Sequence, residues 1–169
     1  DLSKAIDWYT KAAELGNTIA MRNLGYMYRF GEVIEQDYDA ALDWFMKAAE
    51  LGDSDAMFNL GYMYEWGEGV EQDYDAAFDW LTKAAELGDA DAMNLVGEMY
   101  ASGEGVEQDY GAAFDWYTKA AELGSDEAML RLGFMYDLGE GVEMDESTAN
   151  EWYKKAADAG NENAAVFLR

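Results

Sequence analysis

The apolar residues between positions 53 and 88 follow two helical patterns that a glycine-rich stretch separates. In the first pattern, roughly residues 54–66, apolar side chains recur at the three- and four-residue steps of one helix face: Ala56, Met57, Leu60, Met63 and Tyr64. In the second pattern, roughly residues 74–87, one stripe is formed by Ala77, Trp80, Ala84 and Leu87. The pattern therefore predicts a helix–turn–helix unit.

Polar residues and glycines at the ends of these patterns predict where each helix begins and ends. Asp53 and Asp73 precede the two helices, and a carboxylate there accepts a hydrogen bond from the free backbone N–H groups of the first turn. Gly67-Glu68-Gly69 is expected to end the first helix and Gly88 the second, since glycine tolerates the left-handed backbone of a helix C-terminus.

A step of 36 residues relates this unit to the rest of the chain. Tryptophan recurs at that step: Trp8, Trp44, Trp80, Trp116 and Trp152. We predict that these tryptophans lie in the core and that Gly61 and its equivalents let helix backbones approach closely. An acidic residue four positions before a lysine also recurs and predicts surface ion pairs: Asp43/Lys47, Asp79/Lys83, Asp115/Lys119 and Glu151/Lys155.

The 36-residue period predicts one repeat array over residues 1–169. Its parts are a half repeat at 1–16, four full repeats at 17–52, 53–88, 89–124 and 125–160, and a partial helix at 161–169. Short helix pairs bury their apolar faces only by stacking on their neighbours, which makes a solenoid. Because both ends fall inside a repeat, we expect a fragment of a longer array, or ends that pack on another molecule.

The motif of each repeat resembles the Sel1-like repeat, a relative of the tetratricopeptide repeat. Its blocks L-G-x-M-Y, G-x-G-V and W-x-x-K-A-A recur together over nearly the whole chain, with Val33 in place of one loop glycine. The resemblance implies an all-α fold, a right-handed α/α superhelix whose concave face recognises proteins. It also implies a bacterial source.

Composition excludes several classes of function. The chain has no Cys and no His, and its net charge is −25. Without these residues the usual activated nucleophiles and soft metal ligands are missing, so we expect no enzyme activity, metal or cofactor. The negative charge argues against nucleic acid and anionic membrane and favours basic groups on a partner. No stretch reads as a signal peptide or membrane span, and no compartment is indicated.

Positions that differ between repeats are free of a role in the fold, so partner contacts are expected among them. In the first helix of each repeat they share one face, which by similarity to tetratricopeptide repeats lines the concave groove. The candidate partner-binding residues are Arg22, Tyr26, Arg29, Phe30, Asp55, Phe58, Tyr62, Glu65, Trp66, Asp91, Asn94, Glu98, Glu127, Leu130 and Phe134.

Two functions fit this pattern. The first is a scaffold that binds a protein or peptide in the groove through aromatic and arginine anchors, the side chains favoured in interfaces. The alternative is a structural spacer that self-associates end to end and has no dedicated groove. For Phe30 and Phe58, packing between adjacent repeats is an equally good explanation.

Overall fold

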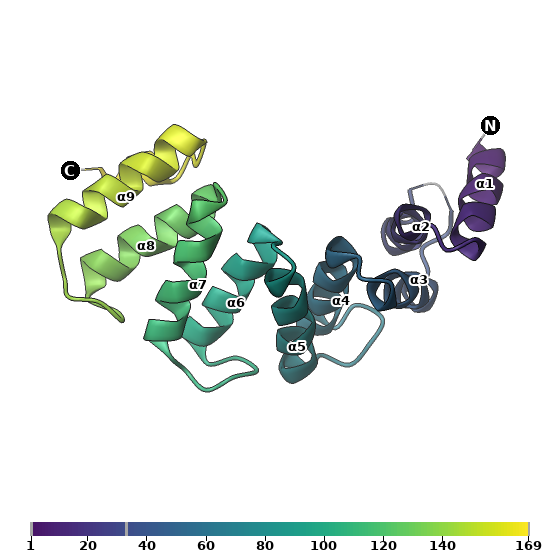
Figure 1. Cartoon of the computed structure of the whole chain (residues 1–169), viewed down its shortest axis with the longest axis horizontal. Helices are drawn as coiled ribbons and strands as arrows, with labels where there is room; N and C mark the ends of the chain where they lie inside the picture. The colour runs from purple at the N-terminus through teal and green to yellow at the C-terminus, as the bar shows by residue number, and fades with distance from the viewer. Residues whose placement is uncertain (1, 33, 169) are drawn as a thin grey trace. The chain divides into compact units, whose positions relative to one another are not determined.

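The computed structural model describes residues 2–32 and 34–168, and within them all regular structure is helical. The predicted all-α fold is therefore confirmed (Figure 1). The elements are α1 (Leu2–Glu14), α2 (Thr18–Phe30), α3 (Tyr38–Glu50), α4 (Ser54–Trp66), α5 (Tyr74–Glu86), α6 (Ala90–Ser102), α7 (Tyr110–Glu122), α8 (Asp126–Leu138), α9 (Glu146–Ala159) and the 3₁₀ turn η1 (Ala164–Phe167). None of these helices is both long and apolar enough to cross a bilayer. The Val33 departure from the repeat motif lies outside the described residues.

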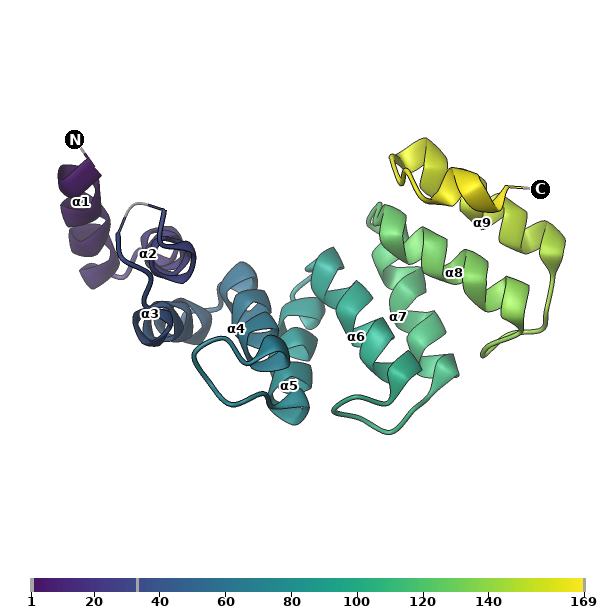
Figure 2. The same cartoon turned by 180° about the vertical axis from the view of Figure 1, so that it is seen from behind.

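The predicted helix ends are confirmed in the second repeat. Asp53 accepts a hydrogen bond from the backbone N–H of Ala56 at 3.0 Å, and Asp73 does the same at the start of α5. Gly67 ends α4 with a φ of 69°, a left-handed conformation in which other residues are strained. Figure 2 shows the longer loop that follows α4, in contrast to the short link from α3 to α4.

The helices form two compact units, one up to Leu87 and one from Gly88 onward. In the first unit α2 packs on α3 and α4 on α5, and α3 packs on α4 to join the two pairs. In the second unit α6 packs on α7 and α8 on α9, with α7 against α8. Each helix pair is thus one repeat, and neighbouring repeats within a unit stack as the period predicts.

The tryptophans are not core residues, which corrects the prediction. Trp8 is 70% exposed, and the four later tryptophans are only half-buried. The buried position is the next one along the helix, where Leu81 is fully buried. One residue turns an α-helix by about 100°, so the true stripe of α5 runs through Ala77, Leu81 and Ala84, and Leu87 is also exposed.

Each lysine after a tryptophan lies over the indole ring. The Nζ atom of Lys83 is 4.2 Å from the centre of the Trp80 ring, and the same contact recurs in the other repeats. The predicted ion pairs of these lysines with the acids four residues earlier are absent from the described residues. The prediction was wrong because a half-buried indole face three residues away attracts the ammonium group and covers its stem.

The repeated glycine of the first helix makes room for a side chain of its partner helix. A Cβ atom on Gly61 would lie 2.6 Å from Cγ of Leu81, and one on Gly133 would lie 2.3 Å from Cε1 of Tyr153. The close approach that the sequence predicted is therefore real, but its main contact is the large buried residue beside each tryptophan rather than a facing backbone.

The start of α9 carries a cap that depends on pH. Asp145 accepts hydrogen bonds from the hydroxyl and backbone N–H of Thr148 and from the backbone N–H of Ser147. The Thr148 hydroxyl is the main cause of a pKa of Asp145 below its ordinary value. Because the folded pKa is lower than the unfolded one, this cap stabilises the helix above the unfolded pKa and is lost as pH falls through the folded pKa.

We expect Thr148→Val to raise the pKa of Asp145 toward its unfolded value, because the substitution removes the hydroxyl and keeps the backbone donors. The carboxyl ¹³C shift of Asp145, followed by NMR through the acidic range, measures this change. Asp73, whose side chain caps α5 through the backbone N–H of Ala76, serves as the internal reference. An Asp145 titration that Thr148→Val does not move contradicts the assignment.

Candidate functional site

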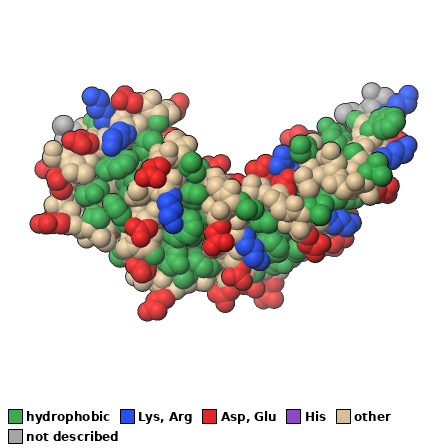
Figure 3. Space-filling model, in the orientation of Figure 1, with side chains coloured by type: hydrophobic (Ala, Val, Ile, Leu, Met, Phe, Trp, Pro, Cys, Tyr) green, Lys and Arg blue, Asp and Glu red, His purple; other side chains and the backbone are tan. Residues whose placement is uncertain are grey.

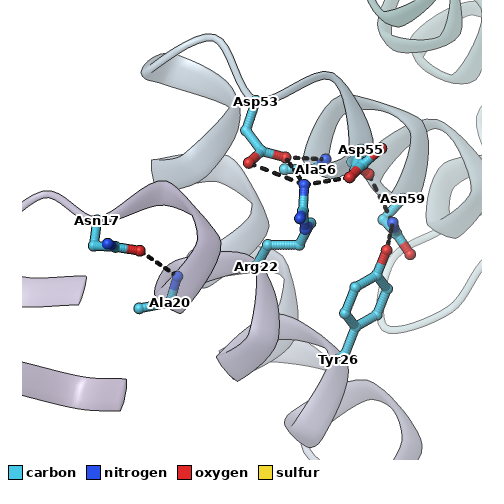
Figure 4. A network of polar contacts seen from close by, with 8 residues as sticks. All are labelled: Asn17, Ala20, Arg22, Tyr26, Asp53, Asp55, Ala56 and Asn59. Carbon is cyan, nitrogen blue, oxygen red and sulfur yellow. Dashed lines mark hydrogen bonds and ion pairs between the residues drawn. The ribbon is translucent and has the colours of Figure 1, made fainter. Parts of the chain in front are cut away.

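Arg22 links α2 to the beginning of α4 (Figure 4). Its Nη1 atom donates to the carboxylates of Asp53, at 3.1 Å, and Asp55. Asp53 is also the N-cap of α4, so the arginine of one repeat holds the helix start of the next. Arg22 and Asp55, both predicted partner contacts, therefore neutralise each other within the first unit.

Asn59 forms a buried polar centre between the same two helices. It is 3% exposed, and its Nδ2 atom donates to the Tyr26 hydroxyl at 2.9 Å and to the carbonyl oxygen of Asp55 at 2.7 Å. Its Oδ1 atom accepts from Nη1 of Arg29 at 2.8 Å. Because Asn59 is buried, its hydrogen bonds hold the Tyr26 hydroxyl and the Arg29 guanidinium in place.

Arg29 is buried between two aromatic rings. Only 8% of it is exposed, and its Nε atom donates to Oε2 of Glu68 at 2.7 Å. The guanidinium carbon lies 4.6 Å from the centre of the Tyr62 ring and 5.1 Å from that of Phe30. Arg29 is thus a support for the aromatic side chains around it, with its charge balanced by Glu68.

Four predicted aromatic side chains lie around the buried Arg29, and we call them the aromatic strip: Tyr26, Phe30, Tyr62 and Trp66. The rings of Tyr26 and Phe30 stack with centroids 6.2 Å apart, and those of Tyr62 and Trp66 are 6.0 Å apart. Phe30 is 55% exposed and Trp66 62% exposed. Next to Phe30 and Tyr26, the surface is hollowed by about 300 Å³.

The other two candidates in the first unit are less accessible. Phe58 is half-buried. Glu65 is half-buried as well, and its carbonyl oxygen accepts a hydrogen bond from Nε2 of Gln72 at 2.7 Å. Neither residue belongs to the aromatic strip.

Most candidate residues of the second unit pack within the fold and are not free to contact a partner. Leu130 is 4% exposed and lies in the core beside Tyr153. Phe134 packs edge-on against Tyr153 and Phe167, with ring centroids 5.6 and 4.8 Å away. Asn94 is buried, whereas Asp91 is exposed.

Arg131 pairs with two of the three acidic candidates of this unit, Glu98 and Glu127. Its Nη2 atom lies 2.8 Å from Oε1 of Glu98 on α6 and 3.0 Å from Oε1 of Glu127 on its own helix. Glu127 also accepts from Nδ2 of Asn161 at 3.2 Å. Arg131 of α8 thus joins two repeats, as Asn59 does in the first unit.

The sequence interpretation missed Asn59, Glu68 and Arg131. A signal for two of them exists, because the positions equivalent to Asn59 in the other repeats hold Asn23, Leu95 and Arg131. This variable position directly follows Phe58 in the sequence, so it lies beside the helix face on which partner contacts were predicted. Glu68 was interpreted only as part of a turn, and nothing in its local sequence shows that Arg29 reaches it.

Acidic side chains dominate the surface outside these contacts. Figure 3 shows carboxylates over both units, with few Lys or Arg side chains between them, in keeping with 36 acidic and 11 basic residues. Such a surface attracts cationic groups over about 8–10 Å at physiological salt.

The chain has clear relatives among proteins of known structure. A family model described as Sel1 repeat matches residues 1–17, 18–53, 54–89, 90–125 and 126–161. A protective antigen of uropathogenic Escherichia coli with an SLR fold is 42% identical, with a TM-score of 0.96, over 99% of this chain and 36% of that chain. The chain therefore spans about a third of the length of that antigen.

Two further structures support the same fold. A Sel1 repeat protein from Oxalobacter formigenes is 41% identical, with a TM-score of 0.90, over 97% of this chain and 67% of that chain. An immunity protein from Pseudomonas aeruginosa is 27% identical, with a TM-score of 0.62, over 97% and 61%. A search of curated proteins finds no match. The predicted helical solenoid is confirmed by these likenesses.

Proposed function

Because the chain belongs to the Sel1 repeat family, whose members generally serve as non-enzymatic scaffolds for protein interactions, we propose that it binds a peptide segment of a partner protein along the aromatic strip. The observation that carries this proposal is the exposure of Phe30 and Trp66 on a surface that buried residues hold in place. Water contact with large aromatic side chains is costly, and contiguous exposed apolar surface commonly marks an interaction site.

The construction of the strip supports a binding role over a packing role. Asn59 holds the Tyr26 ring and Arg29 holds the Tyr62 ring. Binding of a partner therefore costs little free energy for ordering this surface. Amphipathic aromatic side chains are also the usual anchors of peptide interfaces. The acidic surroundings favour a segment with basic residues flanking its apolar anchors.

The proposal is tested by selecting binders from a displayed library of random peptides and measuring their affinity by fluorescence anisotropy. We expect Phe30→Ser together with Trp66→Ser to weaken selected peptides by about 30-fold or more, the loss expected from one hot-spot side chain. The third repeat carries Ser102 at the same repeat position, so serine is compatible with the helix end. Circular dichroism checks that the melting curve is kept.

The matched control is Leu123→Ser, at the C-terminal end of α7 and 57% exposed. It removes a comparable exposed apolar side chain outside the strip and should leave affinity within about twofold. Peptides that bind the double variant as well as the unchanged chain would show that the strip is not the binding surface. Sedimentation of the free chain at rising concentration tests the self-association alternative in the same samples.

A further inference from the structure

One repeat lacks a hydrogen bond that the next repeat forms. In the fourth repeat, the hydroxyl of Tyr153 donates to Oδ2 of Asp137 at 3.1 Å. The equivalent residues in the third repeat are Tyr117 and Ala101. Because the alanine side chain has no acceptor, the Tyr117 hydroxyl has no partner among the hydrogen bonds of the described residues, although only 3% of this tyrosine is exposed.

The missing side chain also leaves a cavity in the second unit. A space of about 210 Å³ extends from Ala101 and Tyr117 to an apolar wall that includes Phe134 and Leu138. An adjoining hollow of about 400 Å³ shares Ala101 and Tyr117 with it and is lined by Glu98, Glu104 and Glu140, together with Arg131. We call the two together the acid-rimmed pocket. A buried tyrosine whose hydroxyl has no hydrogen-bond partner within the described residues therefore lines a cavity with apolar walls and a carboxylate entrance.

The charges around the pocket favour a cation. Arg131 is the single basic residue of the lining. Its Nη2 atom is paired with Glu98 and Glu127, whereas its buried Nε atom has no hydrogen-bond partner within the described residues. Glu104 and Glu140 are left without a cationic partner within residues 2–32 and 34–168. Burial, and next the charge of Glu98, raise the pKa of Tyr117 above its ordinary value. The phenol stays neutral and can accept a hydrogen bond.

We propose that the acid-rimmed pocket binds the guanidinium of an arginine side chain of the partner protein, a step that rests on the proposed function. The flat guanidinium and its aliphatic stem suit the wall of Phe134 and Leu138, and its five N–H donors can reach both the Tyr117 oxygen and a carboxylate. Arginine is favoured over lysine because a guanidinium is more weakly hydrated than an ammonium group and is cheaper to bury.

The experiment uses N-acetyl-arginine methylamide as the probe, titrated into the whole chain at about 150 mM salt, where surface charge is largely screened. NMR follows the methyl group of Ala101 and the ring of Tyr117. We expect saturable shifts at these two residues, weaker binding of the lysine analogue, and no binding of the uncharged citrulline analogue.

Two variants identify the contacts. Tyr117→Phe removes only the hydroxyl and should weaken the probe about tenfold or more, since tenfold is the lower limit for a hydrogen bond to a charged group. Its fold is secure, because Phe45 fills the equivalent position of the first repeat and is fully buried there. Glu140→Gln should weaken the probe about threefold. The control Glu122→Gln makes the same charge change at an exposed site on α7 and should have no effect.

Several results would overturn the proposal. These are shifts spread over the acidic surface without saturation at Ala101, equal binding of the citrulline analogue or of N-acetyl-glutamate methylamide, or unchanged affinity in Tyr117→Phe. Failure of the proposed function has a different signature. Phe30→Ser with Trp66→Ser should leave the arginine probe unaffected, so a chain that binds the probe but yields no selected peptide retains the pocket and loses the scaffold role.

Discussion

Gly133→Ala is expected to lower the free energy of unfolding by about 1–3 kcal/mol, the range of an overpacked core. A Cβ atom at this position would lie 2.3 Å from the ring of Tyr153, which is 1% exposed. Phe134 and Phe167 pack against that ring, so it has no free direction in which to move. The expected loss is opposite to the usual gain when glycine in a helix becomes alanine.

Gly111→Ala provides the matched control in a neighbouring helix. Gly111 is exposed on α7, and its added Cβ would meet only Oδ1 of Asp109, at 3.2 Å. The equivalent positions of the two preceding repeats hold Asp39 and Asp75, so a side chain is tolerated there. We expect stabilisation of up to about 1 kcal/mol. Urea denaturation followed by circular dichroism compares the two variants, and equal stabilisation by both would refute the packing role of Gly133.

Arg29→Met is expected to destabilise the first unit by about 2 kcal/mol, because it removes charged hydrogen bonds to Asn59 and Glu68 while keeping most of the apolar stem. Glu68 is 26% exposed, and water compensates part of the loss at its carboxylate. Asn59 has no such access, and its buried Oδ1 atom would lose the partner that Arg29 provides. The aromatic strip should loosen in the same variant, since Tyr62 loses the guanidinium beside it.

The comparison for Arg29 is Arg22→Met. The Arg22 side chain is more exposed, at 22%, and without it Asp53 still accepts the hydrogen bond from the backbone N–H of Ala56. We therefore expect a cost of about 1 kcal/mol, smaller than that of Arg29→Met. Urea midpoints give the stability difference, and hydrogen exchange of α2 and α4 shows where it arises. If the two variants cost the same, burial of Arg29 does not decide its contribution.

The candidate site was predicted from the sequence only in part. Comparing repeats identified Tyr26, Phe30, Tyr62 and Trp66, because a position that changes between repeats has no fixed role in the stack. The same comparison could not separate exposed from buried positions. Leu130 varies like the others, yet it lies in the core, where a different neighbour in each repeat permits a different side chain.

The acid-rimmed pocket could not be predicted by comparing repeats either. Ala101 stands at a position that varies between repeats, where its equivalents are Arg29, Glu65 and Asp137, and nothing about an alanine indicates a binding site. Tyr117, sixteen residues further along the chain, occupies the position equivalent to Tyr153, but it lacks the hydrogen bond that Tyr153 donates to Asp137. The role of Ala101 is visible only in the folded chain, where its small side chain borders the cavity.

The sequence by itself determined the helices, their ends and the 36-residue stacking unit, because capping, glycine turns and apolar periodicity act within a few residues of the chain. The tertiary structure decided which of two adjacent apolar residues, Trp80 or Leu81, enters the core, since a rotation of about 100° separates them and both fit the pattern. It also decided that Arg29 supports the aromatic strip from within. Its partners lie 30 residues or more along the chain, and only the packing of one repeat on the next brings them together.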